Sequence, residues 1–350
     1  MSLLEKTVLS IGELDRKAMA EARARQDILT KPAGSLGVLE ELAIRVAGIT
    51  GESRPAIGDK VILTMAGDHG VVDEGVSAFP AEVTVQMLGN FVNGGAAINV
   101  LARHVGARVV VADLGVAAPI SLEGVIDRKV RPGAGNIARG PAMSLDEARA
   151  ALEAGIEIAN REIDRGARLI GTGDMGIGNT TPSSAILAVF SGLPAEKAVG
   201  RGTGIDDPGW KRKVDAINRA IEVNRPDPRD GLDVLAKVGG LEIGGLAGSI
   251  LAAAARRVPV LIDGFISGAA ALVAYRIQPR SRGFMIASHQ SVEPGHRVML
   301  SLLGLEPLLK MNLRLGEGTG AALAMSLVDA ALKIQSEMAT FEEAGVSNKD

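Results

Sequence analysis

Short apolar runs alternate along the chain with longer segments of helical periodicity. The runs with strand character are residues 60–67, 107–115, 167–173, 258–264 and 283–288. They are nearly continuous in apolar residues, which is typical of strands that are buried on both faces of a parallel sheet. Helical patterns cover residues 80–104, 144–165 and 244–257. The alternation predicts an α/β fold in which helices flank a parallel sheet.

The two ends of the chain lack strand patterns. The first forty residues and the last thirty are helical or irregular in pattern. We therefore expect a large Rossmann-like α/β domain over residues 36–310. A small, mainly helical domain is expected to combine residues 1–35 with residues 311–350.

Composition narrows the class of protein. Hydrophobic residues make up 47% of the 350 residues, which is ample for a large core. A formal net charge of −3 and an aromatic content of 2% argue against nucleic-acid binding. The absence of cysteine excludes disulfides, thiolate metal sites and thiol nucleophiles. The apolar stretches from Ile243 and Phe265 are too short to span a membrane, and the charged N-terminus does not resemble a signal peptide, so we expect a cytoplasmic enzyme.

Chemically capable side chains stand where the predicted strands end. They are Asp68 and His69, Asp113, Asp174, Asp263, and Ser288 with His289. In open α/β sheets, ligands bind at the carboxyl ends of the strands. Each residue could instead cap the helix that follows. The set as a whole, more than any single residue, favours a ligand site.

The segment GTGDMGIGNTTPSSA, residues 171–185, follows a predicted strand and opens a helix. Glycine amides and a helix N-terminus favour an anion, so the segment indicates a phosphate-binding loop, although a tight turn with an ordinary cap is the alternative. Gly171, Gly173 and Gly176 also match G-x-G-x-x-G. The acidic residue expected about 20 residues later is missing, which disfavours NAD.

Two further glycine clusters flank charged residues. GRGTGIDD, residues 200–207, precedes a helix that carries Lys211, Arg212 and Lys213, where a lysine could meet a phosphate or simply face solvent. LRLGEGTGAALA places Glu317 before an apolar helix. Glu317 could act as a general base, or it could interact with the helix dipole. Burial would raise its pKa and the dipole would lower it.

The segment from Ala66 to Ala97 combines one scarce aromatic, Phe79, with polar side chains such as Gln86. This combination suits a planar heterocyclic ligand. His69, His289 and His296 show no metal-binding spacing, so we expect them to be hydrogen-bonding or structural residues and expect no metal site.

Seven segments between residue 31 and about residue 325 carry a resemblance over most of the chain. They are KPAGSLGVLEELA, AGDHGVVDEGVSAFPAEVT, GTGDMGIGNTT, GRGTGIDD, EIGGLAGSILAAAARRVPVLIDGFI, SHQSVEPGH and LRLGEGTGAA. Together they resemble the nicotinate-nucleotide:5,6-dimethylbenzimidazole phosphoribosyltransferase family. The resemblance implies a homodimer that needs no cofactor. It also implies conversion of nicotinate mononucleotide and 5,6-dimethylbenzimidazole into α-ribazole 5′-phosphate and nicotinate, a step in cobalamin biosynthesis.

The same resemblance implies roles for individual residues. Glu317 corresponds to the general base, and Lys213 to a phosphate-contacting lysine. The remaining phosphate and ribose contacts fall on Asp174, Gly176, Gly178, Asn179, Thr180, Gly202 and Asp263. The pocket for the base falls on Ser77, Phe79, Gln86 and Leu315. Several members of the family carry Glu where this chain has Asp174, and the shorter side chain argues against giving Asp174 the proton transfer.

Two other functions stay open from the sequence. A non-catalytic protein that binds nucleotide or benzimidazole on the same scaffold would keep the phosphate loop and leave Glu317 dispensable. An NAD-dependent oxidoreductase is favoured only by the G-x-G-x-x-G match.

Overall fold

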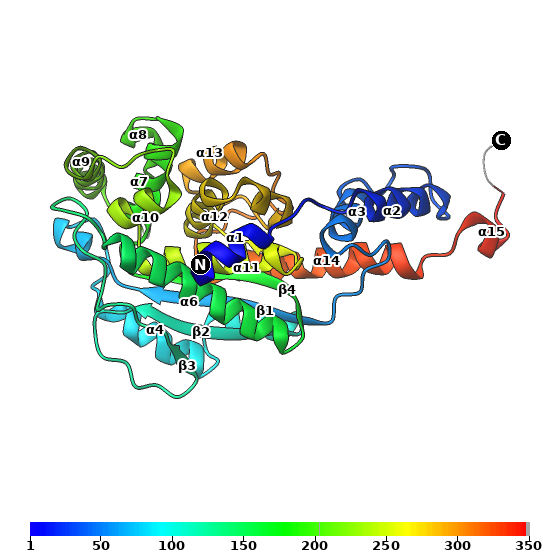
Figure 1. The fold of residues 1–350 in the computed structure, drawn as a ribbon, viewed down its shortest axis with the longest axis horizontal. Helices are drawn as coiled ribbons and strands as arrows, with labels where there is room; N and C mark the ends of the chain where they lie inside the picture. The colour runs from blue at the N-terminus through cyan, green and yellow to red at the C-terminus, as the bar shows by residue number, and fades with distance from the viewer. Residues whose placement is uncertain (203, 348–350) are drawn as a thin grey trace.

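The computed structural model describes residues 1–202 and 204–347, and these residues form a six-stranded parallel sheet (Figure 1). The strand order is β3-β2-β1-β4-β5-β6. The strands are β1 Asp59–Gly67, β2 Ala107–Gly115, β3 Val125–Asp127, β4 Ala167–Met175, β5 Val260–Ile262 and β6 Met285–Ala287. The predicted α/β class with a Rossmann-like parallel sheet is therefore confirmed.

The strands that the sequence predicts are the buried ones. In β1 every residue from Val61 to Gly67 is buried, as a continuous apolar run requires in a sheet covered on both faces. Edge strand β3 was not predicted, because its three residues are only partly buried or exposed and carry no apolar run.

The single helix expected over residues 80–104 is wrong. The segment forms two helices, α4 Glu82–Val92 and α5 Ala97–His104. They are separated by Asn93, two glycines and Ala96, and Gly94 takes a φ of 75°, which a continuous right-handed helix does not allow. The break creates a second helix N-terminus at Ala97.

One face of the sheet is covered by α11 Leu241–Ala255, and α6 Leu145–Asp164 packs against α11 (Figure 1). These two helices meet at backbone distance. A Cβ on Gly155 would lie 1.8 Å from the Gly245 carbonyl oxygen, and a Cβ on Gly248 would lie 1.9 Å from that of Leu152. Only glycine fits at these positions of the crossing.

The opposite face is covered by α4, α5 and the first part of α14 Thr319–Glu337. Helix α14 then leaves the sheet and runs out to α2 Arg16–Ile28, α3 Val38–Thr50 and the short α15 Phe341–Ala344 (Figure 1). A small apolar cluster of Ala22, Ile44 and Ala47 lies between α2 and α3.

These contacts bear on the predicted division into domains. Helix α1 Leu3–Ser10 packs on α6 and α11 of the large unit, whereas α3 packs on α2 and α14. The domain boundaries at residues 35 and 311 stay a prediction. The packing of the helices places α2, α3 and the distal part of α14 together in one helical unit.

The other helices gather mainly around β4–β6 and their connections. They are η1 Gly70–Glu74, α7 Thr180–Ser191, α8 Ala195–Ala198, α9 Asp207–Asn224, α10 Gly231–Val238, α12 Phe265–Ile277, η2 Pro279–Phe284 and α13 Pro294–Leu303. Among the described residues, no helix combines the length and the apolar character that a membrane crossing needs.

Candidate active site

The polar residues at the strand ends do converge. Asp68, Asp174, Asp263 and His289 follow or end β1, β4, β5 and β6, and all four are buried. Because the strands are parallel, these ends meet at one edge of the sheet. Strands β1 and β4 lie side by side where the strand order reverses, which is where open α/β sheets bind ligands.

A small cavity of about 80 Å³ lies beside the end of β4. Its wall is built from two glycine-containing loops and from the segments after β6 and before α14. The lining residues include Asp174, Asn179, Thr180, Gly202, Ser291, Glu293, Arg314 and Leu315. Four of the predicted phosphate- or ribose-binding residues therefore line one cavity.

The loop between β4 and α7 is held rigidly. Asn179 donates from Nδ2 to Asp174 Oδ2 at 2.9 Å, and the Ile177 amide donates to Thr84 Oγ1 at 3.2 Å. Gly176 lies so close to β1 that a Cβ would fall 2.3 Å from the Gly67 carbonyl oxygen. The loop leads directly into the N-terminus of α7, where amide groups and the helix dipole favour an anion.

Lys213 of α9 extends to the same cavity wall. Its side chain is 1% exposed, and Nζ donates to Thr180 Oγ1 at 2.5 Å. Burial lowers the pKa of Lys213 to about 8, although the nearby Glu293 carboxylate opposes that change. A Cβ on Gly202 would lie 3.4 Å from Lys213 Nζ, which places the ammonium group beside the second glycine loop.

Glu317 is buried just before α14. Its Oε2 accepts a hydrogen bond from the Ile98 amide at 3.2 Å, in the first turn of α5. Burial raises the pKa of Glu317, and the Ile98 hydrogen bond only partly offsets this. Burial is therefore the largest influence on the pKa of Glu317.

Asp174 lies against the turn that leads to Glu317. A Cβ on Gly316 would be 3.1 Å from Asp174 Oδ1, and this buried oxygen has no hydrogen-bond partner among the residues that the structure describes. Burial raises the pKa of Asp174 to about 8, and the charges of Asp263, Glu242 and Glu317 add to the shift. Burial thus favours the protonated form of Asp174 at neutral pH.

A buried histidine–glutamate pair lies beside the end of β1. His69 Nε2 lies 2.8 Å from Glu242 Oε1, and both side chains are almost completely buried. Burial opposes the charged imidazolium, yet the charge and hydrogen bond of Glu242 raise the pKa of His69 above its ordinary value. Burial lowers the pKa of His289 to about 4, and its Nδ1 lies 3.1 Å from the Ser288 hydroxyl.

The predicted base-binding residues do not share one site. Leu315 lines the cavity beside β4 together with the phosphate set, although it is 56% exposed. Phe79 is 49% exposed, and Ser77 donates from Oγ to the Phe79 carbonyl oxygen at 3.0 Å. Gln86 lines a separate, mainly apolar hollow of about 450 Å³ together with Asp68, Val85, Ala117 and other residues. The structure does not bring Ser77, Phe79, Gln86 and Leu315 together in one closed pocket.

Several residues of the site were not predicted. Glu293 lies in the quoted segment SHQSVEPGH, and Glu242 lies in EIGGLAG, but neither was given a role. Thr64 and the Ile98 amide carry no local signal, because they reach Glu317 only through the order of strands and helices. Asp263 does not line the cavity, and its carboxylate has other partners.

Comparison with known proteins gives a consistent result. A family model described as phosphoribosyltransferase matches residues 11–346. The nicotinate-nucleotide–dimethylbenzimidazole phosphoribosyltransferase of Chloroflexus aggregans is 60% identical over 350 residues, covering 100% of this chain and 99% of that protein. The enzyme of the same name from Dehalococcoides mccartyi is 57% identical with the same coverage.

Solved structures agree with these relatives. The crystal structure of CobT from Thermus thermophilus superposes with a TM-score of 0.92 at 49% identity, covering 95% of this chain and 100% of that one. The match extends over the sheet, the covering helices and nearly the whole length of the chain. This chain therefore belongs to the phosphoribosyltransferase family of enzymes whose curated members are named nicotinate-nucleotide–dimethylbenzimidazole phosphoribosyltransferases.

Proposed function

We propose that this enzyme transfers the 5-phosphoribosyl group of nicotinate mononucleotide to 5,6-dimethylbenzimidazole. The products are α-ribazole 5′-phosphate and nicotinate, with inversion at the anomeric carbon. The names of the relatives support the substrates. The observation that carries the chemistry is the buried carboxylate of Glu317, whose pKa is raised and whose chain neighbour Gly316 lines a cavity that is suited to a phosphate group.

The reaction makes modest demands on the protein. Nicotinate leaves from a pyridinium, so the electron pair of the broken C–N bond neutralises the ring nitrogen and no acid is needed. The incoming benzimidazole nitrogen forms the new bond on the opposite face of the ribose, and the other ring nitrogen gives up its proton. The enzyme must align two substrates, anchor the phosphate and accept one proton.

The residues divide between these tasks. Lys213, Thr180 and the amides of the loop from Gly176 to Asn179 are positioned to hold the phosphate. Glu317 takes the benzimidazole proton, since burial raises its pKa toward that of an effective general base. Asp174, kept protonated by burial, is suited to donate a hydrogen bond to the ribose and not to remove a proton.

The first experiment is a mass-spectrometric assay with nicotinate mononucleotide and 5,6-dimethylbenzimidazole. We expect nicotinate and α-ribazole 5′-phosphate to appear in equal amounts. Glu317→Gln should lower kcat by roughly 10²–10⁴-fold with little loss of nucleotide binding, because glutamine can still accept the Ile98 hydrogen bond. Glu306→Gln, an exposed glutamate nearby in the sequence, serves as the matched control.

Two outcomes would count against the proposal. Turnover close to normal in Glu317→Gln would remove the general base from the mechanism. Tight nucleotide binding without any product, with this base or with other benzimidazoles, purines and phenols, would favour the non-catalytic binding protein. Family membership leaves no reason to keep the oxidoreductase alternative.

The quaternary structure and the cellular location remain predictions. The family resemblance implies a homodimer, and light scattering coupled to gel filtration would measure it directly. We also retain the expectation of a cytoplasmic enzyme.

A further inference from the structure

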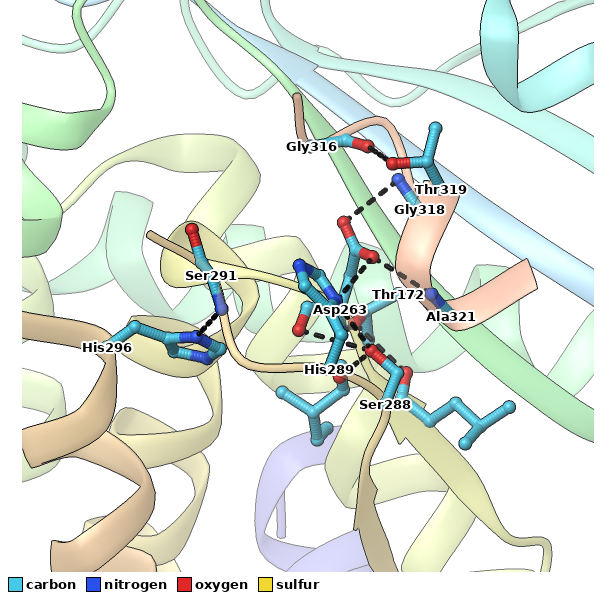
Figure 2. Close-up of polar contacts among 12 residues, drawn as sticks. Thr172, Asp263, Ser288, His289, Ser291, His296, Gly316, Gly318, Thr319 and Ala321 are labelled. Carbon is cyan, nitrogen blue, oxygen red and sulfur yellow. Dashed lines mark hydrogen bonds and ion pairs between the residues drawn. The ribbon is translucent and has the colours of Figure 1, made fainter. Parts of the chain in front are cut away.

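The carboxylate of Asp263 closes the first turn of α14 (Figure 2). Its Oδ2 accepts from the Gly318 amide at 3.2 Å, and its Oδ1 accepts from the Ala321 amide at 2.9 Å. The N-cap residue of α14 is Gly318 itself, which has no side chain to cap the helix. Asp263, which follows β5, therefore supplies the cap from a distant part of the sequence.

The residue immediately before this turn is Glu317, and its backbone is in an uncommon conformation. Glu317 has a φ of 61°, in the left-handed region that glutamate rarely adopts. Such a conformation persists only where the surroundings determine it. The geometry of the general base thus depends on the contacts that hold the turn from Gly316 to Ala321.

Three neighbouring strands supply these contacts. Thr64 of β1 donates from Oγ1 to the Glu317 carbonyl oxygen at 3.1 Å. On β4, a Cβ at Gly173 would lie 2.3 Å from the same oxygen, so only glycine lets the peptide approach. Asp263 after β5 holds the amides on the other side of the turn.

Asp263 is itself fixed from both neighbouring strands. Its own amide donates to Thr172 Oγ1 of β4 at 3.1 Å, and Ser288 after β6 donates from Oγ to the Asp263 carbonyl oxygen at 3.3 Å (Figure 2). The Asp263 side chain is completely buried. A buried carboxylate with these partners binds other parts of the protein. A residue that contacts a ribose or a phosphate would instead have to be accessible to the substrate.

We propose that Asp263 is a positioning residue that fixes the Glu317 backbone through the first turn of α14 and makes no contact with substrate. This inference replaces the ribose or phosphate contact expected from the sequence. It rests on the proposed function, in which Glu317 is the general base.

The test is a double-mutant cycle of Asp263→Asn and Glu317→Gln, each measured with saturating substrates. The asparagine side chain would keep one acceptor and lose the second, so that only one of the Gly318 and Ala321 amides stays paired. We expect Asp263→Asn to lower kcat about 10- to 100-fold, the cost of a base misplaced by about 1 Å, while the dissociation constant of nicotinate mononucleotide changes less than about twofold. In the Glu317→Gln background the same substitution should lower kcat no further, since the group that Asp263 positions is already gone.

Two further variants complete the design. Asp230→Asn makes the same substitution at the N-cap of α10, where Asp230 accepts from the Leu232 and Asp233 amides. Helix α10 carries none of the site residues, so kcat should stay unchanged. If Asp263→Asn does not fold, Thr64→Val removes the hydroxyl that holds the Glu317 carbonyl. It should show the same pattern, with a smaller loss of kcat.

The possible outcomes separate the explanations. A weaker nucleotide affinity in both backgrounds would overturn the proposal in favour of a substrate contact. A lower melting temperature with normal kcat in Asp263→Asn would mean that Asp263 is only an ordinary helix cap, which would also overturn the proposal. A multiplicative loss of kcat in the double mutant would overturn the proposal as well. Normal kcat in Glu317→Gln alone would instead refute the proposed function on which the inference rests.

Discussion

Lys213 allows a prediction in which stability and function change in opposite directions. Its ammonium group is buried, and its pKa is lowered by burial from 10.5 to about 8. A shift of this size corresponds to roughly 3 kcal/mol of destabilisation of the protonated folded protein below pH 8. Lys213→Met keeps the apolar stem and removes the charge. It leaves Thr180 without its partner, which costs about 1 kcal/mol.

We therefore expect Lys213→Met to be about 2 kcal/mol more stable than the wild type at pH 7 and to have a higher melting temperature. Between pH 8 and 10.5 the unfolded wild-type chain binds more protons than the folded one, so the stability of the wild type rises with pH in this range. The advantage of the variant should shrink accordingly. Thermal unfolding at a series of pH values measures both effects.

The same Lys213→Met variant should have a higher KM for nicotinate mononucleotide. A charge-assisted hydrogen bond to phosphate contributes about 1.5–3 kcal/mol, so KM for nicotinate mononucleotide should rise roughly 10- to 150-fold. In the wild type, this KM should also rise above about pH 8, where Lys213 of the free enzyme passes its pKa. Lys211→Met, at an exposed position of the same helix, is the control. A less stable Lys213→Met protein with an unchanged KM would refute the reasoning.

Two further predictions address the site and the fold. Burial raises the pKa of Asp174 from 3.8 to about 8, so between these pH values the folded wild type binds a proton that the unfolded chain has lost, and its stability falls as pH rises. The melting temperature of Asp174→Asn should therefore gain several degrees relative to wild type between about pH 5 and 8.5. A difference that stays constant with pH would contradict the assigned pKa. Gly155→Ala should destabilise the protein by roughly 1–3 kcal/mol or more, because the added Cβ would collide with the Gly245 carbonyl. Gly89→Ala in α4 is the control, since the added Cβ meets open space and the substitution should be neutral or stabilising. Denaturant titration measures both variants.

How far the sequence predicts the fold depends on how local each signal is. The long strands β1, β2 and β4 were predicted because a buried strand must be apolar over its whole length. Strand β3 was missed because three half-buried residues at an edge carry no such pattern. The break between α4 and α5 was missed because apolar periodicity continues across Gly94 and Gly95, and their effect on the backbone was underrated.

The candidate site divides in the same way. Asp174, Asp263 and His289 could be grouped in advance, because parallel strands place their carboxyl ends at one edge. The contacts of Glu317 with Thr64 and with the Ile98 amide depend on which elements become neighbours, and no spacing in the sequence encodes that. The direction of the Glu317 pKa shift depends on its burial, which is a property of the assembled fold.

Helix α14 connects the candidate site mechanically to the distant helices α2 and α3. The helix begins two residues after Glu317 and continues for 19 residues, about 28 Å, until α2 and α3 pack against its far part. Arg25 and Gln26 of α2 bind Gln335 near the end of this rod, with Arg25 Nε 2.6 Å from its carbonyl oxygen. The helical extension therefore links the contacts around Gln335 to the backbone next to Glu317, the proposed general base. Because one continuous helix joins Gln335 to the turn that holds Glu317, we expect substitutions at Gln335 to disturb that turn although they lie far from the candidate site.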